Sequence, residues 1–314
     1  MGKLSFLFPG QGSQHVGMAQ DLYTHYAEAR EVIDAADELL GFSLSAVMFG
    51  SGDPALDDEA LKQTDQTQPA LFTHSMAAMA VLNKYQVPFD MAAGHSLGEY
   101  SALCAAGALS FEDGLRLVRE RGRLMAQAGE QSPGTMAAII GMEDADVESV
   151  CNAITDGVVE PANFNSPGQV VISGEVAAVE QAMALATERG ARRAIPLPVS
   201  GAFHSPLMGH ARDGLAEALS TVTINKPACP VYLNVTAQAS SDPEEIRVRL
   251  LEQLMAPVRW SQTLRAMQED GAESFAEVGA GKVLSGLVKR TLGRKVVTIP
   301  LGGTEEITAY TGSN

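Results

Sequence analysis

Short apolar runs alternate with amphipathic stretches along most of this chain, and that alternation is typical of an α/β fold. Leu4–Phe8 and Asp90–Ala93 each predict a short strand that leads into a glycine-containing turn. Gly98–Gly107 is rich in small residues and predicts a helix directly after the second turn. In Ser110–Gln127 apolar residues recur at helical spacing, so we expect a longer amphipathic helix there.

Residues 131–199 show a different pattern, in which strand and helix signals follow the order βαββαβ. This order is the ferredoxin-like arrangement. We therefore predict a small subdomain at 131–199, inserted into a larger α/β unit formed by residues 1–130 and 200–314. We expect strands at Thr135–Ile140, Val158–Asn163, Gln169–Ser173 and Arg193–Pro198, helices at Ala145–Ile154 and Val176–Arg189, and a connection at 164–168.

Composition favours a soluble, cytoplasmic protein. No apolar run approaches the roughly 18 residues of a membrane-spanning helix, and the apolar part of the N-terminus is too short for a signal peptide. Cys104, Cys151 and Cys229 are an odd number of cysteines with no CxxC pair, so we expect no disulfide framework and a reducing compartment.

Charge narrows the possible partners. The net charge of −16 argues against nucleic acid and against anionic membrane surfaces, which both require a basic face. Residues 278–303 are an exception, because they contain no Asp or Glu. We call their five cations the basic island, and it is either a partner surface or a solvated helix face: Lys282, Lys289, Arg290, Arg294 and Lys295.

The strongest chemical signal is Gly94–Gly98, which matches the G-x-S-x-G pattern of a nucleophile turn. Its small residues allow a tight strand-to-helix turn that exposes the hydroxyl of Ser96. The backbone N–H of Leu97 then faces the position where an oxyanion forms, and the following helix N-terminus adds positive potential. We predict Ser96 as a nucleophile.

A serine nucleophile needs a base. Of the six histidines, His204 follows the apolar run Ile195–Val199 in a loop, which is where a catalytic base belongs. His95 is adjacent to Ser96, and adjacent side chains usually diverge. Spacing alone does not exclude His15 or His210, so both stay open at this stage.

Arg121 is the third candidate. It lies beside Val118 and Met125 at the edge of the apolar stripe of its predicted helix. An arginine that leans inward needs an anionic partner. The alternative is an arginine whose aliphatic stem covers the core while its head stays in water.

Taken together, these residues resemble one family, the malonyl-CoA:acyl carrier protein transacylases of fatty acid synthesis. The shared motifs occur in family order along nearly the whole chain. They are Phe8–Gln14, Gln66–Leu71, Gly94–Tyr100, Arg121-Gly122, Asn163–Gln169, Phe203–Ser205, Asn234-Val235 and Gly279–Lys282.

The resemblance implies a role for each matching position. Ser96 would take the acyl group, and His204 would be its base, oriented by a backbone carbonyl near Gln253 rather than by a carboxylate. Backbone N–H groups of Gln11 and Leu97 would form the oxyanion hole. The implied fold is an α/β-hydrolase-like core that carries the ferredoxin-like insert.

It also implies a substrate. Arg121 would bind the malonyl carboxylate, with Gln253, Phe203 and Asn163 in the substrate site, and Ala202–His204 resembles the malonyl-selective form of related polyketide acyltransferases. Malonyl-CoA would acylate the serine, and the thiol of acyl carrier protein would then take the malonyl group. The acidic carrier would dock on the basic island. No metal or redox cofactor is implied.

Three other functions compete with this one. A serine thioesterase or esterase shares G-x-S-x-G, although an HGGG motif is absent and Arg121 would be an unusual lining for a neutral acyl pocket. A trans-acting polyketide acyltransferase would carry the same motifs. A binding module that kept only the pocket is disfavoured because Ser96, His204 and Arg121 are all present.

Overall fold

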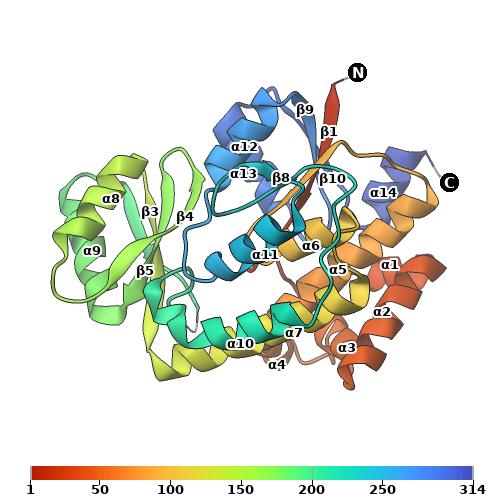
Figure 1. The fold of residues 1–314 in the computed structure, drawn as a ribbon, viewed down its shortest axis with the longest axis horizontal. Helices are drawn as coiled ribbons and strands as arrows, with labels where there is room; N and C mark the ends of the chain where they lie inside the picture. The colour runs from red at the N-terminus through yellow and green to blue at the C-terminus, as the bar shows by residue number, and fades with distance from the viewer. Residues whose placement is uncertain (1, 200, 313–314) are drawn as a thin grey trace.

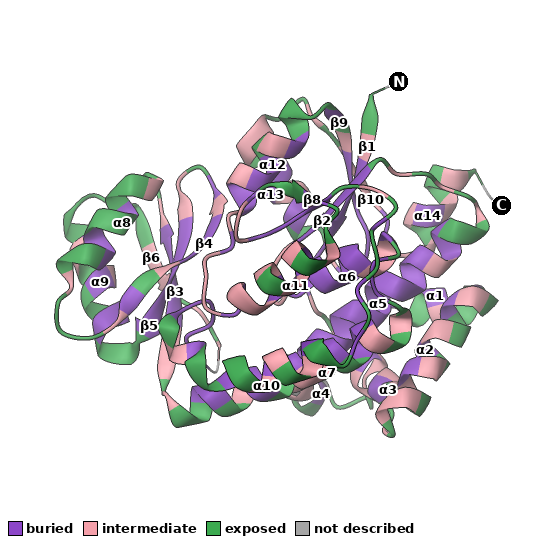
Figure 2. Cartoon of the chain, viewed as in Figure 1, coloured by how far each residue is buried: buried purple, intermediate pink, exposed green. Residues whose placement is uncertain are grey.

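The computed structural model describes residues 2–199 and 201–312, which form two sheets with helices packed around them (Figure 1). None of the helices in these two ranges combines the length and apolar character of a membrane-spanning helix. Figure 2 shows that buried positions concentrate in the strands and in the central helix α5 (Thr64–Lys84).

The larger sheet has six strands in the order β10-β9-β1-β2-β7-β8, and every neighbouring pair is parallel except β7 and β8. Parallel strands end at the same edge of a sheet, and Phe8 pairs with Gly94 at that edge. The loops that follow β1 and β2 therefore lie side by side. The strands are β1 (Lys3–Phe8), β2 (Met91–Gly94), β7 (Val231–Tyr232), β8 (Ala239–Ser240), β9 (Ala272–Glu277) and β10 (Val297–Pro300).

Most helices belong to this larger unit. The helix α5 is buried on nearly all sides, and Pro69 within it cannot donate a hydrogen bond to the Asp65 carbonyl. Arg119 Nη1 donates to that oxygen instead, at 2.5 Å, and joins α5 to α7. The other helices are α1 (Gln20–His25), α2 (Ala27–Leu40), α3 (Leu44–Phe49), α4 (Pro54–Lys62), α6 (Gly98–Ala105), α7 (Phe111–Gln131), η1 (Pro206–Met208), α10 (Gly209–Ser220), α11 (Pro243–Glu252), α12 (Trp260–Glu269), α13 (Val283–Leu292) and α14 (Thr304–Thr311).

The smaller sheet is antiparallel, with the order β4-β5-β3-β6. Its elements are β3 (Gly134–Ile140), α8 (Asp144–Ala153), β4 (Val159–Ser166), β5 (Gln169–Glu175), α9 (Val176–Glu188) and β6 (Arg193–Pro196). Ile139, Val147, Phe164, Ile172 and Val179 belong to a core of its own. This is the ferredoxin-like order, so the predicted fold class, an α/β-hydrolase-like core with a ferredoxin-like insert, is confirmed. The boundaries at 131 and 199 stay a prediction, and residue 200 lies outside the described residues.

One predicted connection is shorter than expected. β4 continues to Ser166, so only Pro167 and Gly168 turn the chain, and Gly168 has a φ of 72°. The reason is tertiary: the Phe164 side chain is buried in the small core, and its N–H donates to the Val258 carbonyl at 2.9 Å. The polar residues Asn165 and Ser166 therefore continue the strand, because Phe164 before them is held by its packing and pairing.

Candidate active site

The turn between β2 and α6 holds Ser96 in a left-handed backbone conformation, with a φ of 51°. Both glycines of the motif are required by space. A Cβ on Gly94 would lie 1.8 Å from the Gly98 carbonyl oxygen, and a Cβ on Gly98 would lie 2.1 Å from that of Phe8. The strained turn is thereby packed against β1, and it presents the Ser96 hydroxyl at the carboxyl edge of the sheet.

The structure brings Ser96 and His204 together, with Oγ 2.8 Å from Nε2. Gln253 ends α11, so its carbonyl has no intrahelical partner, and it accepts a hydrogen bond of 2.8 Å from His204 Nδ1. That bond leaves Nε2 as the acceptor that faces the serine. Burial and the nearby Arg121 lower the pKa of His204 to about 3, so the ring is neutral near pH 7.

Two residues next to Ser96 in the described structure have backbone N–H groups that are free to bind an oxyanion. Asn234 Oδ1 accepts the N–H of Ser96 at 2.7 Å, so that group is already used. Within residues 2–199 and 201–312, the N–H groups of Leu97 and Gln11 donate no hydrogen bond. Gly10 keeps the two loops close, because a Cβ there would lie 2.3 Å from the His95 carbonyl oxygen.

The guanidinium of Arg121 lies inside the protein, with 1% of the residue exposed. It donates to Gln68 Oε1 at 2.8 Å, to Gln253 Oε1 at 2.9 Å and to Ser96 Oγ at 3.1 Å. All three acceptors are neutral, and no carboxylate of the described chain pairs with it. A buried cation with only neutral partners is poised to receive an anion.

A pocket of about 100 Å³ opens above the serine. Asn163 lines it with Nδ2 buried and without a partner in the described chain, while Phe203 and Met125 supply apolar walls. Gln253 does not line the pocket, because it is fully buried behind Arg121 and His204. The lining residues are Gln11, His95, Ser96, Leu97, Arg121, Met125, Met136, Asn163, Leu197, Val199, Phe203 and His204.

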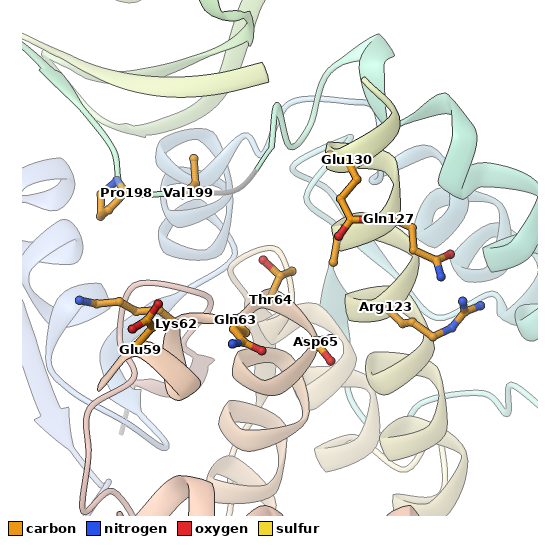
Figure 3. Close-up of a pocket in the computed structure, with 12 residues that line it drawn as sticks. Glu59, Lys62, Gln63, Thr64, Asp65, Arg123, Gln127, Glu130, Pro198 and Val199 are labelled. Atoms are coloured by element: carbon orange, nitrogen blue, oxygen red, sulfur yellow. The ribbon is translucent and has the colours of Figure 1, made fainter. Parts of the chain in front are cut away.

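A larger pocket, of about 620 Å³, is drawn in Figure 3. Val199 lines both pockets. The sides of the larger pocket are formed by Glu59–Asp65, at the junction of α4 and α5, and by Arg123–Glu130 of α7. The lining of this larger pocket contains neither Ser96 nor His204, so it is not the catalytic pocket.

Sequence reasoning gave no role to Gln68, Asn234 or Glu99, although all three lie inside the shared motifs. Their signal is a polar side chain in a segment that is otherwise apolar or small: each of them is at most 1% exposed. The open alternatives for the base lie elsewhere. His15 lines a separate pocket, and His210 is exposed.

A nucleophilic serine on a strand-to-helix turn, paired with a neutral histidine on this fold, defines a serine-dependent acyl-transfer enzyme. Comparison with known proteins agrees: residues 5–305 match the family model described as acyl transferase domain. A malonyl CoA-acyl carrier protein transacylase of Bacillus subtilis is 45% identical over 309 residues, 98% of this chain and 96% of that protein. The chain belongs to the malonyl CoA-acyl carrier protein transacylase family.

Solved structures of the same kind of protein share the fold along nearly the whole chain. A malonyl CoA-acyl carrier protein transacylase of Coxiella burnetii has a TM-score of 0.93 at 40% identity, covering 99% of this chain and 97% of that one. A malonyl-transacylase solved in complex with its type II PKS acyl-carrier protein has a TM-score of 0.94 at 38% identity, covering 99% of this chain and 100% of that one.

Proposed function

We propose that this protein transfers the malonyl group of malonyl-CoA to the phosphopantetheine thiol of acyl carrier protein, through an ester on Ser96, and so supplies fatty acid elongation. The observation that carries the proposal is the buried Arg121, which lies 3.1 Å from the Ser96 hydroxyl and has only neutral partners. The names of the relatives support the same substrate and acceptor.

In the first half-reaction, His204 Nε2 accepts the proton of Ser96 as Oγ attacks the thioester carbonyl carbon. The negative charge on the carbonyl oxygen is held by the N–H groups of Leu97 and Gln11. When the C–S bond breaks, the imidazolium returns its proton to the CoA sulfur. Ser96 then carries the malonyl group as an ester.

The second half-reaction reverses these roles. His204 takes the proton of the carrier thiol, the sulfur attacks the ester carbonyl, and the same two N–H groups hold the oxyanion. The C–O bond breaks, and Ser96 regains its proton from His204. Both half-reactions use one base and one oxyanion site. Because CoA leaves before the carrier thiol attacks the ester on Ser96, malonyl transfer follows ping-pong kinetics.

Specificity for malonyl follows from charge. The substrate carboxylate leaves water on entering the pocket and needs a cation there. The planar fork of Arg121 binds a carboxylate through two parallel hydrogen bonds, and the unpartnered Asn163 Nδ2 donates to the bound substrate. Phe203 forms an apolar wall of the same pocket.

The carrier docks on the basic island in our proposal. Lys289 and Arg290 lie in the last turn of α13. Arg290 Nη1 donates to Gln169 Oε1 of the small subdomain at 2.5 Å, so this part of the island lies beside the β4–β5 hairpin. Lys282 is partly neutralised by Glu306, 2.7 Å away. The exposed Lys289, Arg290, Arg294 and Lys295 are then the main attraction for an acidic partner.

We place the reaction in the cytoplasm. The support is that Cys104, Cys151 and Cys229 are free thiols, which a reducing compartment preserves.

Intact-mass spectrometry tests the reaction. Mixing the protein with malonyl-CoA should add one malonyl group, and adding carrier protein with its free thiol should move that group to the carrier. Acetyl-CoA and methylmalonyl-CoA should label weakly in parallel. Loss of the malonyl group to water as fast without the carrier as with it would identify a thioesterase and contradict the proposal.

A further inference from the structure

One buried carboxylate has no part in the mechanism above. Glu99 is the second residue of α6 and is fully buried. Its Oε2 accepts two hydrogen bonds, from the Asn234 N–H at 2.9 Å and from Gln253 Nε2 at 3.0 Å. Its Oε1 has no partner in the described chain. Burying a carboxylate costs free energy unless hydrogen bonds compensate it. Two donors directed at one oxygen of Glu99 therefore indicate that its charge contributes to the arrangement of the site.

The first donor leads to the nucleophile turn. Besides its N–H bond to Glu99, Asn234 accepts the N–H of Ser96 through Oδ1 at 2.7 Å. Its Nδ2 donates to the Gly94 carbonyl, also at 2.7 Å. Asn234 therefore ties both sides of the turn to Glu99, and it leaves the neighbouring Leu97 N–H free for the oxyanion.

The second donor leads to the base and the arginine. Gln253 Nε2 donates to both Glu99 and the Ser96 carbonyl, the latter at 3.0 Å. Two acceptors on that side fix the orientation of the amide, so Oε1 must face Arg121, 2.9 Å away. The backbone carbonyl of the same residue orients His204.

We propose that Glu99 is a positioning residue, whose carboxylate fixes Asn234 and Gln253 and through them Ser96, Arg121 and His204. The inference rests on the proposed function. It also explains how a buried arginine without a direct carboxylate partner is tolerated: the charge of Glu99 faces it across the side-chain amide of Gln253. Glu99 itself touches neither the substrate nor the reacting atoms.

Electrostatics support the geometry. Burial raises the pKa of Glu99 to about 7, against the effects of its two donors and Arg121. The ionisable groups that face it are Arg121 of α7 and Tyr100 of its own helix, with His204 beyond Gln253. Glu99 is therefore ionised above about pH 7. Protonation below that weakens both hydrogen bonds, because bonds to a charged acceptor are the stronger ones.

The substitution E99Q keeps the shape of the side chain and removes its charge. We expect acylation by malonyl-CoA at about pH 8 to fall about ten- to hundred-fold, since two charge-assisted hydrogen bonds become neutral ones. The thermal unfolding midpoint should stay unchanged or rise, because a buried charge is gone. The matched control is Glu180→Gln on the exposed face of α9, which should change neither quantity.

A pH profile adds a readout that a merely structural role would not move. Native acylation should fall as the pH drops through about 7, far above the pKa of His204, about 3. E99Q should lack this acid limb. An E99Q rate within about twofold of the native rate, or an acid limb that survives in E99Q, would overturn the inference.

The pH profile of the native protein needs no substitution, so it tests the role of Glu99 even if E99Q does not fold. A native acylation rate that is constant between about pH 8 and about pH 6 would overturn the inference. Failure of the proposed function gives a different result. In that case malonyl-CoA would not acylate even the native protein at any pH, or the malonyl group would pass to water as fast without the carrier as with it.

Discussion

Replacing Arg121 with alanine tests the physical basis of malonyl selection. Arg121 is the one guanidinium that lines the pocket of the described structure, and its head lies 3.1 Å from the Ser96 hydroxyl. Without it, a malonyl carboxylate enters a buried pocket with no cation to bind. A neutral acyl group loses no partner and gains room.

The magnitude follows from burial. Removing one partner of a buried ion pair costs about 3–5 kcal/mol, because the remaining charge stays uncompensated. At about 1.4 kcal/mol per factor of ten, malonyl acylation should fall by about 10²–10³ or more. Gln68 and Gln253 also lose a donor, so the unfolding free energy should fall by about 1–3 kcal/mol per unsatisfied oxygen.

The assay is acyl-enzyme formation from malonyl-CoA and acetyl-CoA in parallel. Arg121→Ala should lose malonyl transfer while acetyl transfer holds or rises, and Arg121→Lys should recover only part, since an ammonium lacks the planar fork. Arg116→Ala, an exposed arginine of the same helix, is the matched control and should change neither rate. Equal loss of both acyl groups in Arg121→Ala would refute the reasoning and make Arg121 a structural residue.

Three further predictions follow from the same contacts. His204→Ala should slow acylation by about 10²–10⁴; a near-native rate would remove His204 as the base. Lys289→Glu with Arg290→Glu should weaken the carrier half-reaction and its salt dependence while acylation by malonyl-CoA is spared; unchanged carrier kinetics at low salt would contradict docking there. Burial lowers the pKa of His74 to about 4, so the unfolding free energy should fall as the pH drops from about 6.5 to about 4. His74→Asn should reduce that fall by up to about 3 kcal/mol; an unfolding free energy that is equally sensitive to acid in the variant would refute this.

The sequence pattern predicts those features of the fold that depend on residues close together in the chain. The Gly94–Gly98 turn needs glycine because of contacts within a few residues and with the adjoining strand, so its pattern is visible in the sequence. The βαββαβ order of the small subdomain is equally visible. For residues 164–168 the sequence predicts a connection, but three of them belong to β4 because Phe164 packs in the small core and its N–H bonds to the Val258 carbonyl.

Long-range partners were not predictable from pattern. His204 and Gln253 are 49 positions apart, and of the sequence signals only the family resemblance relates them. Whether Arg121 leans inward or into water could not be decided from its helix alone, because its partner Gln68 comes from α5. The same holds for Glu99, whose two donors come from distant loops.

The central claim is that malonyl transfer passes through an ester on Ser96, whose hydroxyl lies 2.8 Å from His204 Nε2. Peptide mapping by mass spectrometry after a short exposure to malonyl-CoA tests it directly, with Ser96→Ala as the control. The account predicts one malonyl group on the peptide that contains Ser96, lost on addition of carrier thiol, and no labelling of the variant. A malonyl group on another residue, or undiminished labelling of Ser96→Ala, would contradict it.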